Sequence, residues 1–326
     1  MGRWMLRLLS LGLSFAIIVG FVAIWGWMAF TKPGPLGQPI NVVIPRGTGL
    51  DGIAIRLVEA GVITDPRVLV LGAKATGRAR GLKAGEFRFP AAVSPREALD
   101  ILESGETVVR RLTVAEGLTS SAVIALLNSA EGLEGTAALP PEGSLLPETY
   151  HYAWGDTRSE LLRRMTRSQD EAVARLWETR AADLPFETPE QAVILASIVE
   201  KETGVASERP LIAGVFINRL KRGMRLQSDP TVAYGIAGGT GLDRSLTRAD
   251  LKAPTPYNTY TQNGLPPGPI SNPGEASIAA VLNPADTNFL YFVADGTGGH
   301  VFARTLAEHN RNVRAWRQYR REGARQ

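Results

Sequence analysis

The 326-residue sequence contains no cysteine and only three histidines. The lack of cysteine excludes disulfides, thiolate metal sites and cysteine nucleophiles. The histidines, His151, His300 and His309, do not have metal-ligand spacing. Neither a P-loop nor a nucleophile elbow occurs. We therefore expect no metal site and no cofactor.

Charged residues are absent from residues 8–30, a run of 23 residues that is long enough to span a bilayer. A cleaved signal peptide is the alternative, but the run exceeds a usual h-region and no small-x-small site precedes the proline-rich stretch. Arg3 and Arg7 precede the run and only Lys32 follows it. The positive-inside rule then predicts a single membrane helix with a cytoplasmic N-terminus and with the long C-terminal part outside the cytoplasm.

The excess of basic over acidic residues is confined to the two ends of the chain. The formal net charge is +4, and Arg3, Arg7 and Lys32 precede the first acid, Asp51, which leaves about +1 for the rest. Seven arginines lie between residues 304 and 325, against two glutamates. The middle of the chain therefore lacks a basic stripe, and we expect no nucleic-acid partner.

The segment after the apolar run predicts a small module. Residues 33–39 (PGPLGQP) are too rich in proline and glycine for a helix and are interpreted as a linker. Residues 42–63 and 111–133 share one plan of strand, glycine turn and amphipathic helix, which indicates a weak internal repeat. Ser94, followed by proline and then by Glu97, predicts a capping box. Residues 40–140 are thus predicted to form an α+β module.

Residues 47–52 form a GxGxxG pattern between a predicted strand and helix. A dinucleotide site would require an acid about 20 residues further on, closing a second strand, and none occurs there. The second copy of the repeat also lacks the pattern. We interpret these glycines as a strand-to-helix turn.

The stretch ILASIVEKETG (194–204) lies in a helix predicted to start at Pro189, after a capping box at Thr188. Glu200 is preceded by a nearly unbroken apolar run, which indicates burial on several faces. A carboxyl there, short of partners, would serve as a general acid. The alternatives are a glutamate paired with Lys201 or an arginine, and a Ser197/Lys201 acyl hydrolase.

Later segments predict further elements. Asp229 is expected to cap a short helix that begins at Pro230, and Asn272 to cap a helix that runs to about Leu282. The loop 257–272, rich in tyrosine, asparagine, glycine and proline, is long enough to be a binding loop. A hairpin is predicted over residues 289–303, and a closing helix follows.

Six motifs in order carry a resemblance to a known family: ASIVEKET (196–203), LIAGVFINRL (211–220), LQSDPTVAYG (226–235), YNTY (257–260), GLPPGPISNPG (264–274) and YFVADGTGGHVF (291–302). The chain resembles the YceG-like (MltG) family of endolytic murein transglycosylases over almost its whole length. Where the family usually has aspartate before a Thr-Tyr pair, this chain has Glu148.

The resemblance implies an α+β protein with four parts. These are a cytoplasmic tip and transmembrane helix (1–32), the linker (33–39), a LysM-like module (40–140) and a mixed helical and β catalytic domain (141–326). It also implies a lytic transglycosylase that cuts the MurNAc-β-1,4-GlcNAc bond of nascent peptidoglycan strands, leaves a 1,6-anhydroMurNAc end and terminates strand elongation.

The family's catalytic glutamate is assigned to Glu200, and Gln227, Asn258 and Tyr260 are the candidate substrate contacts. The candidate partners are peptidoglycan glycan strands, the inner membrane and peptidoglycan synthases (penicillin-binding proteins). Two other functions stay open: a glycoside hydrolase that uses Glu200 with Asp229 and water, and a non-catalytic wall-binding scaffold.

Overall fold

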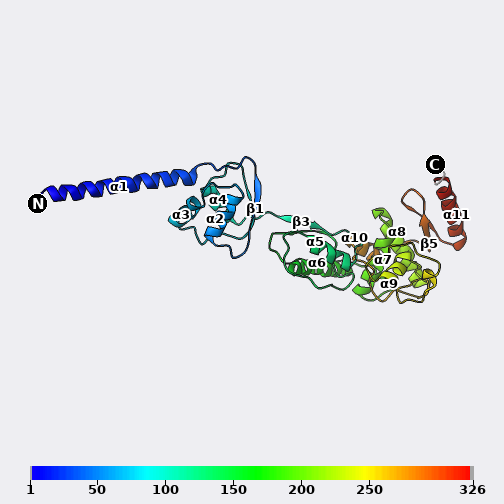
Figure 1. Ribbon diagram of the computed structural model, residues 1–326. Coiled ribbons are helices and arrows are strands. Elements are labelled where there is room, and N and C mark those ends of the chain that lie inside the picture. The colour runs from blue at the N-terminus through cyan, green and yellow to red at the C-terminus, as the bar shows by residue number, and fades with distance from the viewer. Residues whose placement is uncertain (1, 324–326) are drawn as a thin grey trace. The chain divides into compact units, whose positions relative to one another are not determined.

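The computed structural model describes residues 2–323 and divides into two compact units (Figure 1). Unit 1 extends to Arg110 and includes residues 131–134 and 151–156, and unit 2 contains the remaining residues. The domain boundary at residue 140 stays a prediction. The compact units divide near Arg110, and most of the second repeat copy lies in unit 2. The fold is mixed α and β, as predicted.

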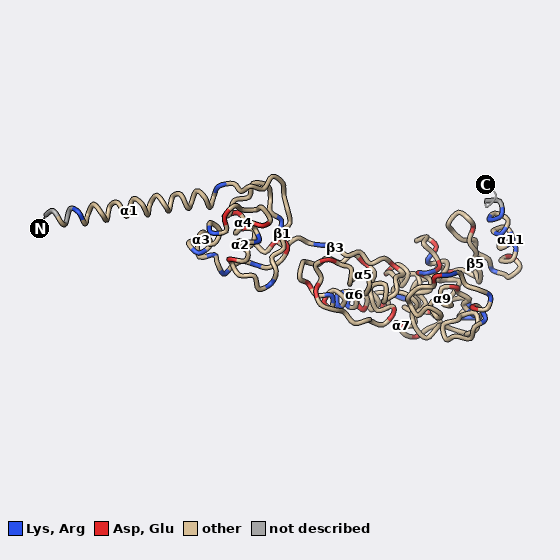
Figure 2. Tube along the Cα trace, in the orientation of Figure 1, with Lys and Arg blue, Asp and Glu red and all other residues tan. Residues whose placement is uncertain are grey.

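Unit 1 begins with α1 (Gly2–Thr31), a helix that is long and apolar enough to cross a membrane. Within residues 7–31, the most apolar 18-residue window has a mean hydropathy of 2.4, and none of that window is buried. Figure 2 shows this helix without acidic residues and with basic residues only near its two ends. Exposed apolar surface of this extent is costly in water, so the helix suits a membrane anchor or a signal sequence.

The rest of unit 1 is a two-stranded antiparallel sheet packed with three helices. Strand β1 (Ile40–Ile44) pairs with β2 (Gly85–Phe89), with Ile40 opposite Phe89 and Ile44 opposite Gly85. The helices are α2 (Leu50–Glu59), α3 (Pro66–Ala75) and α4 (Pro95–Ser104). Alternating β2 side chains enter one apolar core, in which Phe87 and Phe89 are fully buried. The predicted capping box at Ser94 is confirmed.

The segment predicted to be a linker is attached to unit 1. The backbone N–H of Gly34 donates to the carbonyl of Val93 over 3.1 Å, and Ala92 N–H donates to the carbonyl of Leu36 over 2.8 Å. A Cβ atom at residue 34 would lie 2.4 Å from the Val93 oxygen, so only glycine fits this approach. Phe30, in the last turn of α1, is 3% exposed within the same core.

Unit 2 is built around the apolar helix α7 (Pro189–Glu202). This helix begins at the predicted capping box of Thr188 and packs against α6 (Arg158–Glu178), α8 (Arg209–Lys221) and α10 (Glu275–Leu282). Residues 195–199 are buried without a break, so the helix is covered on several faces, as the apolar run predicts. The remaining elements are β3 (Arg110–Thr113), α5 (Ser120–Ser129), β4 (Thr149–Tyr152), η1 (Ala206–Glu208), α9 (Asp229–Ala237), η2 (Asp250–Lys252), β5 (Tyr291–Ala294), β6 (His300–Ala303) and α11 (Leu306–Gly323). Strand β3 pairs with β4, and β5 with β6 as the predicted hairpin.

Two predicted helix caps are wrong. Helix α9 starts at Asp229 with Ser228 at its N-cap position, and no side chain caps it. Helix α10 has Gly274 at its N-cap, again without a side-chain cap. The Asn272 side chain instead accepts from Leu145 N–H over 3.0 Å and donates to the Leu118 carbonyl over 3.0 Å. The Asp229 side chain likewise accepts from the Tyr260 hydroxyl. Asp229 and Asn272 therefore bond to other segments of the chain and do not cap the helices that follow them.

Candidate active site

The last turn of α7 carries two glutamates with different surroundings. Glu200 and Glu202 are two residues apart, which places them about 200° apart around the helix axis. They therefore face different neighbours, and the structure assigns each a distinct set of contacts.

Glu200 belongs to a closed ion-pair cluster. Its side chain is 5% exposed, and Oε1 lies 3.4 Å from Arg209 Nη2 at the start of α8. The same nitrogen lies 2.7 Å from Glu116 Oε2. The backbone N–H of Gly274 donates to Glu200 Oε2 over 2.9 Å, which ties α7 to the start of α10. The expectation that Glu200 is short of partners is wrong, since both carboxylate oxygens are held.

Glu202 has one held oxygen and one free one. The Ser228 hydroxyl donates to Glu202 Oε1 over 2.5 Å. Among the residues the structure describes, Oε2 has no hydrogen-bond partner, and Glu202 lines a cleft. Burial raises the pKa of Glu202 above the ordinary glutamate value, and the nearby Asp229 carboxylate adds to the rise. The Ser228 hydrogen bond and the charges of His300 and Arg219 oppose it without cancelling it.

A buried hydroxyl network fixes Ser228 beneath Glu202. The backbone N–H of Ser228 donates to Thr259 Oγ1 over 2.9 Å, and that oxygen lies 2.9 Å from the hydroxyl of Thr231. Thr231 in turn donates to the Ser228 carbonyl over 2.7 Å. All three residues are at most 1% exposed. Satisfied buried networks of this kind are rigid, so Ser228 presents its hydroxyl to Glu202 in one position.

The cleft beside Glu202 has a volume of about 430 Å³ and includes two of the predicted contact residues, Gln227 and Tyr260. Gln227 has φ of 55°, in the left-handed region that a non-glycine residue adopts at a cost. Tyr260 donates its hydroxyl to Asp229 Oδ1 over 2.6 Å. Burial and Asp229 together raise the pKa of Tyr260, so its phenol stays protonated. The cleft thus combines a carboxyl, an amide and a phenol.

A buried arginine also lines the cleft. Arg219 is 7% exposed, and no carboxylate lies within 4.0 Å of it in the described part of the chain. Its guanidinium donates to the carbonyls of Leu290 over 2.6 Å and Leu226 over 2.7 Å, and it lies over the Tyr291 ring at 5.2 Å. Because no carboxylate neutralises Arg219, its positive charge can stabilise a negative charge that develops in the cleft.

His309 completes the cleft wall from α11. Its ring stacks on Tyr291 with centroids 5.2 Å apart, and its Nδ1 atom is buried without a hydrogen-bond partner in the described chain. Burial, with Arg219 nearby, lowers the pKa of His309 and keeps the imidazole neutral.

The third predicted contact, Asn258, does not line this cleft. It is fully buried, and its amide nitrogen donates to the carbonyls of Ala253 over 2.7 Å and Asp250 over 3.1 Å. Its oxygen accepts from Tyr260 N–H over 2.9 Å. Asn258 therefore shapes the loop that presents Tyr260, and its side chain is too deep to meet a ligand.

Sequence reasoning missed three polar residues of this cleft, namely Glu202, Arg219 and His309. Only Glu202 had a local signal, since it follows Glu200 by two positions near the end of the same buried helix. Arginine in α8 and histidine in α11 carry no sequence pattern that distinguishes a cleft residue from a solvated one.

Comparison with known proteins identifies the family. The model of the YceG-like family matches residues 42–315, so the chain belongs to this family. An endolytic murein transglycosylase of Bacillus subtilis is 33% identical over 83% of this chain and 83% of its own length. A protein of the same name from Streptococcus pneumoniae is 30% identical over 84% of this chain and 58% of its own.

A solved structure supports the same relationship. The crystal structure titled as a yceG-like protein of Listeria monocytogenes has a TM-score of 0.52 and 29% identity. The match covers 84% of this chain and 99% of that one.

Proposed function

We propose that this protein is a membrane-anchored endolytic lytic transglycosylase of peptidoglycan, with Glu202 as its acid and base. The names of the relatives support the reaction class and a murein substrate. The observation that carries the assignment is a carboxyl that lines a cleft together with Gln227 and Tyr260 and whose pKa is raised by burial. Glu200, the residue predicted from the sequence, stays a candidate that the same experiment tests.

Glu202 suits the acid role better than Glu200 because of how its oxygens are used. An acid must carry its proton on an oxygen that reaches the leaving group. The Ser228 hydroxyl donates to Oε1 of Glu202, which leaves Oε2 available to carry a proton. Glu200 accepts from Arg209 and Gly274, and these two donors occupy both of its oxygens.

The proposed reaction needs one carboxyl and no water. Glu202 donates its proton to the glycosidic oxygen as the bond from that oxygen to C1 of the muramyl sugar breaks. The muramyl C6 hydroxyl then attacks C1, and its proton passes to the Glu202 carboxylate, which restores the acid. The products are a strand with a 1,6-anhydro end and a strand with a free hydroxyl. Ordinary glycosidases differ because they require a second carboxylate to activate water or to form a covalent bond.

Arg219 and Tyr260 support the charge changes in this scheme. Once Glu202 has lost its proton, the field of Arg219 stabilises the carboxylate, consistent with its lowering effect on the pKa of Glu202. The Tyr260 phenol, held by Asp229, offers a hydrogen-bonding edge and a ring to a sugar. Gln227 offers an amide for sugar hydroxyls.

We further propose that α1 anchors the protein in the inner membrane, with the catalytic unit in the periplasm. The uncharged stretch of α1 is flanked by more basic residues before it than after it. Its last turn enters the core of unit 1 through Phe30, so cleavage within the helix would remove part of a folded core. A cleaved signal peptide would not be expected to contribute a side chain to the core of the mature protein.

The deciding experiment is mass spectrometry of glycan strands treated with the full-length protein in detergent. Fragments one water lighter than hydrolysis products establish the transglycosylase. Glu202→Gln should abolish them, whereas the matched Glu200→Gln variant, two residues away, should retain them. The reverse pattern would assign the acid to Glu200.

Other products identify other functions. Reducing ends would indicate a hydrolase that uses water, with Asp229 as its second carboxylate. If no strand is cleaved by the wild-type protein, the wall-binding scaffold becomes the better explanation.

A further inference from the structure

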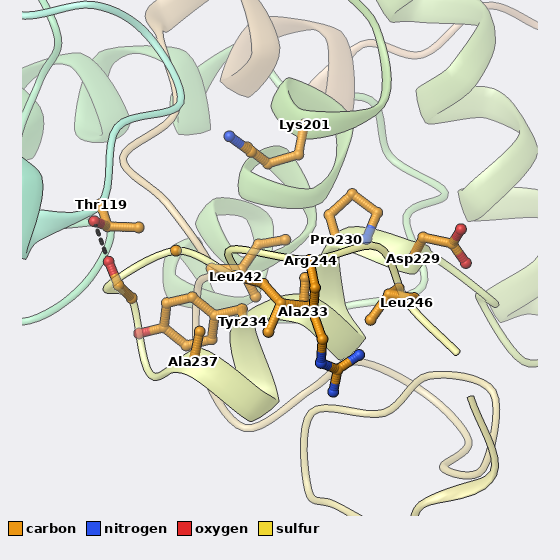
Figure 3. A pocket seen from close by; sticks show the side chains of 13 residues that line it. Thr119, Lys201, Asp229, Pro230, Ala233, Tyr234, Ala237, Leu242, Arg244 and Leu246 are labelled. Carbon is orange, nitrogen blue, oxygen red and sulfur yellow. Dashed lines mark hydrogen bonds between the residues drawn. The ribbon is translucent and has the colours of Figure 1, made fainter. Parts of the chain in front are cut away.

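A second cavity in unit 2, of about 390 Å³, adjoins the cleft of Glu202 (Figure 3). Asp229 lines both spaces, and α7 supplies Glu202 to the cleft and Lys201 to the cavity. We call this space the Lys201 cavity. It lies between α9, the segment 239–246 and Lys201, and its lining residues are Thr119, Lys201, Asp229, Pro230, Ala233, Tyr234, Ala237, Gly239, Gly241, Leu242, Arg244, Leu246 and Ile270.

The walls of the Lys201 cavity are mainly small and apolar. Ala233 and Ala237 lie one helical turn apart on α9, and leucine, proline and isoleucine side chains complete the wall. The polar groups present are largely occupied within the protein. The Tyr234 hydroxyl donates to Glu142 over 3.2 Å, and the Thr119 hydroxyl donates to the Gly239 carbonyl over 2.7 Å. Such a wall offers few partners to a sugar, whose hydroxyls lose hydrogen bonds with water on entry.

Lys201 is exposed and has no carboxylate partner among the described residues. Among the described residues no carboxylate oxygen lies within 4.0 Å of its ammonium nitrogen, whose printed contact is the Gly117 carbonyl at 3.3 Å. Figure 3 shows the Lys201 ammonium and the Asp229 carboxylate directed away from each other. The other cation of the wall, Arg244, is neutralised by Asp250 through contacts of 2.6 and 3.0 Å. Among the described lining residues, Lys201 is therefore the cation without a carboxylate partner, and the wall beside it is mainly apolar, with the Asp229 carboxylate turned away from it.

We propose that the Lys201 cavity binds the peptide stem of peptidoglycan while the glycan lies in the Glu202 cleft. A stem of short residues with methyl side chains and free carboxylates matches the alanines of α9 and the ammonium of Lys201. This inference rests on the proposed function and refines its substrate class. It makes strands that carry peptides the preferred substrate over peptide-free strands.

Binding to the inactive Glu202→Gln form of the full-length protein tests the inference without turnover. Three glycan probes of equal length are compared by calorimetry: peptide-bearing, peptide-free, and peptide-bearing with every free carboxylate amidated. We expect the peptide-bearing probe to bind about tenfold more tightly than the other two, as one hydrogen bond to a charged group would provide.

Lys201→Gln in the same background should remove most of this tenfold difference. Because the substitution and the amidation delete the same contact, their effects should not add. Lys74→Gln, which alters an exposed lysine of α3, is the matched control and should preserve the difference. Ala237→Leu, which fills the cavity without touching Lys201, should weaken the peptide-bearing probe alone.

Equal dissociation constants for the three probes would overturn the inference. So would a preference that survives both Lys201→Gln and Ala237→Leu. Neither result bears on whether wild-type protein releases anhydro ends, so a failure here stays distinguishable from a failure of the proposed reaction.

Discussion

Unit 1 and unit 2 differ in what they bury. Among the described residues, unit 1 buries two polar or charged side chains, Glu86 and Ser94, whereas unit 2 buries twelve. Glu86 has a plain structural explanation, since Arg110 contacts it over 2.7 Å and Asn41 over 3.1 Å. In unit 2 the buried polar set includes Ser228, Thr231 and Thr259, which lie beneath Glu202.

The comparison teaches where the chain accepts a stability cost. Burying a polar group is unfavourable unless its hydrogen bonds are replaced, and an apolar core is the simpler solution. Unit 1 adopts that solution around Phe87 and Phe89. Unit 2 retains a hydroxyl network next to a carboxyl that is itself destabilised when ionised. Substitutions in the two units should therefore separate a core that only supports the fold from a network that supports chemistry.

The largest effect is expected at Glu202. Glu202→Gln should lower turnover of glycan strands about 10²–10⁴-fold, the usual range for loss of a general acid. The unfolding free energy should not fall, because glutamine keeps the shape and removes a carboxyl that burial disfavours when ionised. Turnover is measured from anhydro ends and stability by urea unfolding. If the unfolding free energy falls enough to account for the lost turnover, the role of Glu202 is structural and not catalytic.

The core of unit 1 should give the opposite result. Leu99 of α4 is fully buried, and Leu99→Ala should lower the unfolding free energy by about 2–5 kcal/mol through lost apolar burial and a cavity. Turnover per folded molecule should stay unchanged, since Leu99 lies far along the chain from Glu202 and in the other unit. The activity of the folded fraction is compared with that of the wild type. Reduced turnover in that fraction would couple unit 1 to catalysis.

Asn258 should combine both effects at a smaller scale. Asn258→Ala leaves several buried carbonyls and the Tyr260 N–H without partners, which costs about 1–3 kcal/mol. Turnover should fall with it because Tyr260 loses its position. The exposed Gln227 provides the control: Gln227→Asn, which keeps a residue tolerant of positive φ, should lower turnover and spare stability.

The smallest effect is a shift in pH dependence. The reaction starts from protonated Glu202, so kcat/KM should fall as pH rises through the raised pKa of this group. Asp229→Asn removes a charge that raises this pKa, and the alkaline limb should then move to lower pH. Burial is the larger cause, so the limb should stay above the range of an ordinary glutamate. If the alkaline limb of kcat/KM does not move in Asp229→Asn, a group other than Glu202 causes it.

The raised pKa of Glu202 also predicts how the unfolding free energy changes with pH. Folded Glu202 holds its proton to higher pH than the unfolded chain does, so the unfolding free energy should fall as pH rises from the unfolded pKa through the folded one. Glu202→Gln should remove that contribution, and Glu200→Gln provides the comparison.

Much of the fold followed from local sequence signals. The capping boxes at Ser94 and Thr188, the apolar helix that leads to Glu200, the hairpin of residues 289–303 and the helix of residues 8–30 were predicted and are present. Each depends on interactions within a few residues or on a periodic pattern, so the chain encodes them locally. The family motifs likewise indicated the enzyme class before any geometry was known.

The roles of individual site residues were decided by contacts between distant segments. Arg209 and Gly274 close around Glu200, whereas Ser228 holds one oxygen of Glu202 and leaves the other for the cleft. The two glutamates are near neighbours in sequence, yet these partners come from other elements. Local pattern therefore determined that an acid stands near the end of a buried helix. Only the tertiary structure gives the two acids different surroundings, because burial and the choice of hydrogen-bond donor are set by packing.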